Sequence, residues 1–105
     1  MIDAKAAIAA GQETIRAEAR ALDQLAEALA GPLAGPFAHA ADLLFQAEGR
    51  VIVSGMGKSG HIARKIAATL ASTGRSAYFV HPAEASHGDL GMIVEADCVL
   101  AISRS

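Results

Sequence analysis

At the centre of the 105-residue chain stands Arg50-Val51-Ile52-Val53-Ser54-Gly55-Met56-Gly57-Lys58-Ser59-Gly60. The apolar and small residues 51–54 predict a short buried strand. Three glycines follow the strand, and because they carry no Cβ they let the backbone turn sharply and approach a ligand closely. A helical pattern begins directly after them, so free N–H groups and the positive end of a helix dipole meet at one point. The stretch therefore predicts an anion-binding strand, turn and helix, with Lys58 adding a formal positive charge.

The length and composition fit a single domain. The net charge gives no reason to expect binding to nucleic acid or to an anionic membrane. Hydrophobic residues make up 52% of the chain, aromatic residues only 4%, and the net charge is −2. Cys98 is the one cysteine, so no disulfide can form within the chain, and a reducing cytoplasm is the expected location. The N-terminus lacks a basic region followed by an apolar core, and no run of about 18 apolar residues occurs. We therefore predict neither a signal peptide nor a membrane span.

Residues 1–48 predict an N-terminal helical segment. Asp3 is a suitable N-cap for a long helix from Ala4 to about Ala30, and a second helix is expected over 36–48. The first helix carries a narrow apolar seam at near-heptad spacing, made of Ile8, Ile15, Leu22, Leu25 and Leu29. Such a seam suits packing on its own domain or, as in helix–helix association, on another subunit.

Residues 49–105 show the alternation of strand and helix segments that is typical of an α/β fold. Strands are predicted over 51–54, 76–80 and 98–103, with a helix over 59–73. The strands are continuous apolar runs, which is typical of parallel strands covered on both faces. The third strand is followed almost at once by the last residue, so we expect a truncated portion of a longer domain whose open strand edge favours a homo-oligomer.

The glycine loop, residues 55–60, fits some ligands better than others. A nucleotide P-loop needs a glycine at position 52, where this chain has isoleucine. A dinucleotide site would use the three glycines, but it also requires an acidic residue at the end of the second strand. The expected strand ends at residue 80 and the nearest acidic residue is Glu84, so this alternative is disfavoured. A sugar-phosphate site needs a turn, a cation and hydroxyls, all of which are present. A tight turn without a ligand is the remaining alternative.

A second polar stretch, residues 81–91, follows the expected end of the second strand. It holds two histidines, His81 and His87, and two carboxylates, Glu84 and Asp89. Such groups can bind sugar hydroxyls, transfer protons near neutral pH or hold a metal. The histidines lack the i, i+4 spacing of a helical zinc pair, so a polar ligand is favoured over a metal, with a purely structural loop as the alternative.

Residues 55–62, 65–74 and 81–91 closely resemble the sugar isomerase (SIS) domain of arabinose-5-phosphate isomerases. The resemblance implies a flavodoxin-like parallel sheet flanked by helices, here an incomplete three-strand portion preceded by two helices. It also implies an isomerase that interconverts D-ribulose 5-phosphate and D-arabinose 5-phosphate in the cytoplasm, on the route to Kdo and lipopolysaccharide. The alternative is a sugar-phosphate-binding regulatory module without catalysis.

The resemblance also implies roles for individual residues. It implies that Lys58 is catalytic, because an amine there can neutralise phosphate or the developing enediolate. The substrate-binding residues expected from the glycine loop and the resemblance are Gly55, Gly57, Ser59, Gly74, Arg75, His81, His87, Ser103 and Ser105. No cofactor is required, and His81 is implied in an inhibitory zinc site.

Two positions depart from the family pattern. Arg75 and Arg104 each stand where a smaller residue is usual, the latter within Ser103-Arg104-Ser105, the start of the family's phosphate loop. The family's later catalytic carboxylates and its catalytic histidine would lie beyond Ser105. We therefore expect the 105-residue chain alone to show negligible isomerase activity.

Overall fold

The computed structural model describes residues 1–104, apart from the side chains of Asp89 and Leu90. It separates the chain into two compact units, Met1–Ala40 and Ala41–Ser105. The boundary falls inside the second helix, which is continuous across it. Each unit is described by itself below.

The first unit is built on α1 (Ala4–Leu29), which begins where the sequence predicts. The Asp3 carboxylate caps the helix by accepting hydrogen bonds from the backbone N–H groups of Lys5 (3.0 Å) and Ala6 (3.3 Å). No residue of α1 is buried, and the seam residues Ile15 and Leu22 are each 67% exposed. Among the residues described for this unit, the seam therefore has no partner.

No helix in the described part of the chain is long and apolar enough to cross a membrane.

The second helix, α2 (Ala34–Gln46), begins two residues earlier than expected. Pro36 falls in its first turn, where the missing N–H is no loss because the first N–H groups of a helix have no partner within it. At its other end, Leu44 packs against the core of the second unit.

A three-stranded parallel sheet forms the centre of the second unit. Its strands are β1 (Val51–Gly55), β2 (Ala77–Phe79) and β3 (Cys98–Ile102), in the order β2-β1-β3. Val51 pairs with Ala77 on one side and with Cys98 on the other. The central strand is the most buried, with Val51, Ile52 and Val53 at most 2% exposed. The predicted α/β class with three parallel strands is confirmed.

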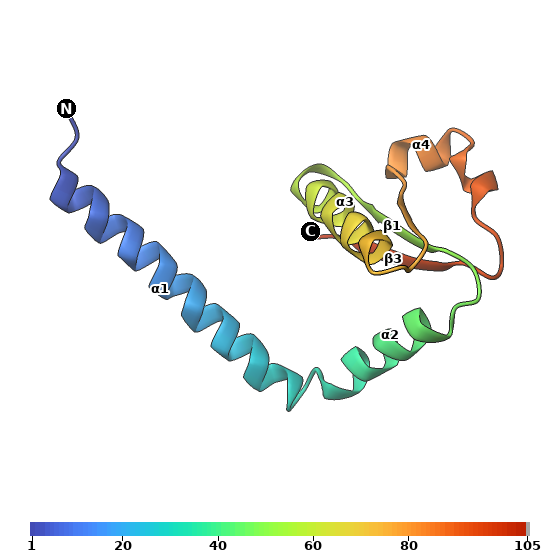
Figure 1. The fold of residues 1–105 in the computed structure, drawn as a ribbon, viewed down its shortest axis with the longest axis horizontal. Helices are drawn as coiled ribbons and strands as arrows, with labels where there is room; N and C mark the ends of the chain where they lie inside the picture. The colour runs from blue at the N-terminus through green and yellow to red at the C-terminus, as the bar shows by residue number, and fades with distance from the viewer. Residues whose placement is uncertain (105) are drawn as a thin grey trace. The chain divides into compact units, whose positions relative to one another are not determined.

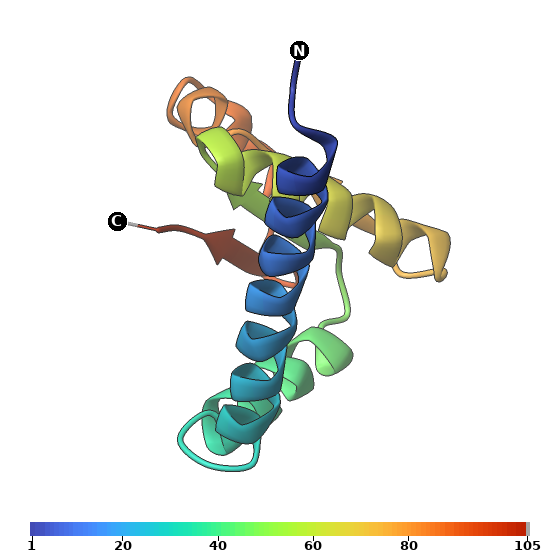
Figure 2. The same cartoon turned by 90° about the vertical axis from the view of Figure 1, so that its left-hand side faces the viewer.

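Helix α3 (Gly57–Ser72) covers one face of this sheet (Figure 1). Its buried residues Ala63 and Ala67 form the core with Val51 and Val53. Alanine side chains are small, so the helix can lie close to the strands, and Figure 2 shows the same arrangement from the side. The helix begins two residues before the expected start, and its first residue, Gly57, has a φ of +57°, which glycine adopts without strain.

The opposite face is less covered than the sequence suggests. Tyr78 in β2 is 50% exposed and Val99 in β3 is 52% exposed. Both outer strands alternate between half-buried and exposed side chains. The expectation of strands covered on both faces therefore holds only for β1 within the described residues.

The connection from β2 to β3 contains α4 (Pro82–Ser86) and the 3-10 helix η1 (Asp89–Met92). The predicted polar stretch is therefore partly helical, since Pro82 at the first helical position has its φ already set for a helix. An ion pair between Asp97 and Arg50 (3.2 Å) joins the end of this connection to the start of β1. The Asp97 carboxylate also accepts the backbone N–H groups of Arg50 (2.7 Å) and Val94 (3.0 Å).

Candidate functional site

The glycine loop brings the end of β1 against the first turn of α3. A Cβ added to Gly60 would lie 2.7 Å from the carbonyl oxygen of Gly55, so only glycine permits this approach. Met56 occupies the N-cap position of α3 and makes no side-chain capping hydrogen bond. The first-turn N–H groups are thus left for solvent or a ligand, as the sequence predicts.

The order of the strands in the sheet predicts where a ligand binds. Because β1 lies between β2 and β3, the chain leaves β1 in one direction toward β2, and β3 lies on the other side. Open parallel sheets bind ligands beyond the carboxyl ends of the strands at such a switch point. A pocket of about 390 Å³, here called the switch-point pocket, lies at this place. It is lined by Ser54, Gly55, Met56, Pro82, Ala101, Ile102, Ser103 and Arg104.

Hydroxyl groups and one cation give the switch-point pocket its polarity. Ser54 Oγ donates a hydrogen bond to the carbonyl oxygen of Val80 (2.5 Å), so it faces a ligand as an acceptor. Ser103 and Arg104 are exposed at the end of β3. Within the described part of the chain, no carboxylate lines this pocket. The arrangement suits a small polar anion such as a sugar phosphate.

A second pocket, here called the His81 pocket, lies on the α3 side of Gly55. Its volume is about 240 Å³, and its lining is Gly55, Gly57, Gly60, His61, Arg64, Phe79 and His81. Gly55 lines both pockets. Both pockets lie at the edge of the sheet where the strands end, here called the carboxyl edge. Four of the predicted substrate residues therefore lie at this edge, namely Gly55, Gly57, His81 and Ser103.

The hydrogen bond at His81 determines which of its nitrogens faces a ligand. Nδ1 accepts the backbone N–H of Ala83 (3.1 Å) and so caps α4. A nitrogen that accepts carries no proton, so in the neutral ring Nε2 bears the proton and is a donor. Such a donor suits a sugar or phosphate oxygen. The ring also packs edge-on to Phe79, with centroids 6.4 Å apart.

The same hydrogen bond bears on the zinc prediction. A metal at Nε2 would move the proton to Nδ1 and break the cap to Ala83. The part of the chain that the structure describes also holds no group of three or more His, Cys, Asp or Glu side chains arranged for a metal. Zinc binding at His81 stays a prediction.

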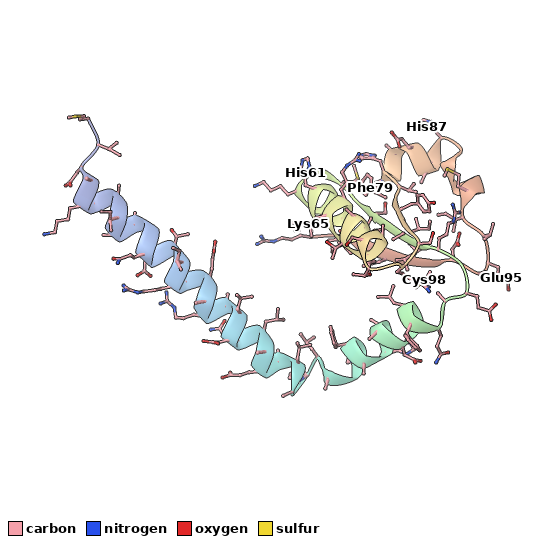
Figure 3. The ribbon with its side chains drawn as sticks, in the orientation of Figure 1. His61, Lys65, Phe79, His87, Glu95 and Cys98 are labelled. Atoms are coloured by element: carbon pink, nitrogen blue, oxygen red, sulfur yellow. The ribbon has the colours of Figure 1, made fainter. Side chains whose placement is uncertain are left out.

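Three predicted residues lie near the carboxyl edge but line neither pocket. Lys58 is exposed in the first turn of α3, and Ser59 beside it is half-buried. His87 is exposed at the C-cap of α4, where its backbone N–H donates to the carbonyl of Glu84 (3.0 Å). Figure 3 shows His87 beside α4, whereas His61 lies at the start of α3.

Two other predicted residues lie at the opposite edge of the sheet. Gly74 and Arg75 precede β2 and line a separate pocket at that end. The Arg75 guanidinium donates to the carbonyl oxygen of Ala47 (2.6 Å), which holds it on the chain that leads into β1. The structure does not bring this pair to the glycine loop, and Ser105 lies outside the described residues.

Sequence reasoning missed His61 and Arg64, which line the His81 pocket. A signal was available in their spacing, because Gly57, His61 and Arg64 are four and three residues apart and share one helical face. The Arg64 guanidinium lies over the Phe79 ring, 4.1 Å from its centroid. This contact across to β2 could not be read from the sequence.

Comparison with known proteins places this geometry in a family. The model of the SIS domain family matches residues 43–105. An arabinose 5-phosphate isomerase, KdsD, of Pseudomonas aeruginosa is 54% identical over 98 residues, which are 93% of this chain and 29% of that protein. Another, GutQ of Escherichia coli K12, is 52% identical over 101 residues, 96% of this chain and 30% of that protein. The chain thus spans about 30% of the length of these curated relatives.

A solved structure extends the comparison. An E. coli CFT073 protein in complex with arabinose 5-phosphate superimposes on 99% of this chain with a TM-score of 0.85 and 41% sequence identity. This chain covers 53% of that protein. The likeness includes both units of the fold described above.

Proposed function

The chain belongs to the SIS domain family, and on this premise we propose that it supplies the sugar-phosphate site of an aldose–ketose isomerase. The substrates are D-ribulose 5-phosphate and D-arabinose 5-phosphate. The observation that carries the proposal is the solved relative of the same fold in complex with arabinose 5-phosphate. The names of the curated relatives support the same substrate.

The switch-point pocket receives the phosphate of the sugar. Arg104 supplies a positive charge there, and the backbone near Gly55 and Ser103 supplies hydrogen bonds. His81 donates from Nε2 to a sugar oxygen. His87 and Ser59 stay predicted substrate contacts, whereas Gly74 and Arg75 lie at the opposite edge of the sheet and are not assigned to this sugar.

Isomerisation moves one proton between adjacent carbons through a cis-enediol. A base removes the proton from C2 of the aldose while the C1 carbonyl oxygen takes up a proton, which gives the cis-enediol. The C2 hydroxyl then loses its proton as the C2 carbonyl forms, and the base returns a proton to C1. The charge that develops on oxygen is stabilised by the Lys58 amine, whose long flexible side chain can turn toward the sugar. The described residues that line the two pockets include no carboxylate, so we assign these residues binding and charge stabilisation and leave the base unassigned.

The second candidate is a regulatory module that binds the sugar phosphate in the same pockets without converting it. The two candidates share the binding step and differ only in turnover. An experiment that measures turnover therefore separates them.

A chimera provides the test. This chain replaces its matching segment in the Pseudomonas aeruginosa relative, to which it is 54% identical over 98 residues. We expect the chimera to convert D-arabinose 5-phosphate to D-ribulose 5-phosphate within about tenfold of the parent rate, since a tenfold change corresponds to about 1.4 kcal/mol. A folded chimera that binds the sugar phosphate without turnover would instead support the regulatory module.

The wider setting follows from the same proposal. The reaction would feed Kdo and lipopolysaccharide synthesis in the cytoplasm. A homo-oligomer would form through the exposed seam of α1 and the open edge of the sheet. No cofactor is required, and zinc at His81 would inhibit.

A further inference from the structure

We propose that the apolar seam of α1 in one copy of the chain docks on the outer face of α3 in a second copy, where Glu18 pairs with the partner's Lys65. The docking surface, here called the α3 groove, has a volume of about 380 Å³ and is lined by Ile62, Lys65, Ile66, Thr69 and Leu70. The inference rests on the proposed homo-oligomer, whose contact it specifies, and not on isomerase turnover. Its evidence is the shape and the charge of the two surfaces.

The α3 groove is a largely apolar surface with one cation. Ala63 and Ala67 form the buried face of α3, whereas Ile62 is 55% exposed. Lys65 lies three residues after Ile62 and four before Thr69, so the three share one face of the helix. Figure 3 shows Lys65 projecting outward from α3. Helix α3 contains no acidic residue, so the charge of this face is positive.

The seam of α1 carries the complementary charge. Glu18 lies three residues after Ile15 and four before Leu22, so a carboxylate interrupts the apolar seam. A carboxylate that is buried among apolar side chains costs free energy unless a cation pairs with it. The surface that covers the seam must therefore supply a cation in an apolar setting, as the α3 groove does with Lys65. Among the described residues, neither Glu18 nor Lys65 forms an ion pair.

Charge also disfavours pairing of the seam with itself. The seam runs from Ile8 to Leu29, and Glu18 lies beside its midpoint. A parallel pair of α1 helices in register, or an antiparallel pair centred on the seam, would bring two Glu18 carboxylates together. Like charges that face each other at an interface are repulsive. The α3 groove avoids this repulsion and replaces it with attraction.

Two copies can make this contact reciprocally. Each copy carries one seam and one groove, so a dimer that exchanges its α1 helices forms the contact twice. Such an interface closes on itself, whereas a contact made in one direction only would continue into a ring or a filament. The proposal therefore predicts a discrete dimer.

Reversal of either charge tests the pairing, by sedimentation of the full 105-residue chain. Glu18→Lys and Lys65→Glu should each raise the dissociation constant of the dimer about tenfold or more, because like charges then meet in both contacts. Both side chains are exposed, so the circular dichroism spectrum should not change. An unchanged parent chain that sediments as a monomer would overturn the proposal.

An equimolar mixture of the two variants shows whether the contact joins two copies. In a mixed dimer each contact again pairs one lysine with one glutamate. The mixture should therefore sediment as a dimer, with a dissociation constant within about threefold of the parent value. A mixture that stays as weakly associated as the separate variants would overturn the proposal, because the pairing would then lie within one chain or be absent.

Glu27→Lys is the matched control. It makes the same charge change nine residues along α1, which is about 180° around the helix from Glu18, and it should associate as the unchanged chain does. Equal weakening by Glu27→Lys and Glu18→Lys would overturn the proposal by assigning the effect to net charge.

Two further outcomes keep this inference separate from the proposals on which it stands. Association that persists in both charge-reversal variants would overturn it and leave the homo-oligomer to another surface, such as the open edge of the sheet. Lys65 lines neither of the two pockets at the carboxyl edge, so binding of the sugar phosphate should be unchanged in Lys65→Glu. A chain that forms the predicted dimer but binds no sugar phosphate would contradict the proposed function and still support this contact.

Discussion

At the scale of single residues, chemistry at the carboxyl edge depends on a few side chains and on how each is held. His81 is fixed by its cap to α4, whereas Lys58 is exposed and held by no hydrogen bond among the described residues. The fixed N–H donor of His81 is suited to orienting a bound sugar. The flexible amine of Lys58 is suited to stabilising negative charge that develops only during the reaction. Different substitutions should therefore separate the two roles.

Lys58→Ala should lower kcat of the chimera about 100- to 1,000-fold, because it removes one group that stabilises developing charge. The fold should be unchanged, since the side chain is exposed. Lys65→Ala, on the same helix, is the control and should retain activity. A Lys58→Ala chimera with near-parental turnover would remove the role assigned to this amine.

His81→Asp should separate capping from binding. Aspartate is a good N-cap, so α4 should persist, but its negative charge faces the sugar phosphate. We expect affinity for D-arabinose 5-phosphate to fall about tenfold or more, measured by calorimetry, with an unchanged circular dichroism spectrum. Unaltered affinity would show that His81 does not face the ligand.

At the scale of elements, the close contact between β1 and α3 depends on a missing side chain. A Cβ at Gly60 would meet a backbone carbonyl at 2.7 Å, whereas a Cβ at Gly11 in α1 would meet nothing within 4 Å. The same substitution should thus have opposite effects in the two helices.

Gly60→Ala should destabilise the second unit by about 1–3 kcal/mol, because α3 must move away from β1. Gly11→Ala should instead stabilise α1 by up to about 1 kcal/mol. Thermal unfolding followed by circular dichroism measures both. Equal effects would mean that α3 can shift without cost.

The junction of Arg50 and Asp97 makes stability depend on pH. Backbone hydrogen bonds, from Val94 first and then from Arg50, hold the pKa of the Asp97 carboxyl below its ordinary value of 3.8, and the charge of Arg50 adds to them. A lowered folded-state pKa stabilises the fold fully above the unfolded-state value, and this contribution is lost as the pH falls through the folded-state pKa.

Asp97→Asn should therefore be less stable than the unchanged chain at pH 7. The difference should shrink as the pH falls below 3.8. Urea unfolding across this range measures the effect. A difference that stays constant with pH would assign the loss to packing and not to the charge.

At the scale of the whole molecule, what could be predicted from sequence was the local pattern. The strand of residues 51–54, the glycine turn and the cap at Asp3 follow from nearest neighbours along the chain. Contacts across the sheet do not, so Arg64 over Phe79 was missed. For the same reason, the sequence pattern does not reveal that Gly74 and Arg75 lie at the opposite edge of the sheet from the glycine loop.

The apolar seam of α1 should drive self-association of the chain. Ile15→Lys places a charge in the seam and should shift the chain toward monomer in analytical ultracentrifugation. Ala17→Lys adds the same charge about 200° around the helix and should leave association unchanged. A monomeric parent chain, or equal effects of both variants, would exclude the seam as the interface.

The central claim is that the carboxyl edge around Gly55 binds a sugar phosphate. The most direct measurement titrates the ¹⁵N-labelled chain with D-arabinose 5-phosphate and, separately, with unphosphorylated D-arabinose. We predict saturable shifts of the Gly55 and Ser103 amide signals with the phosphorylated sugar alone. Shifts confined to Gly74 and Arg75, or identical shifts with both sugars, would contradict it.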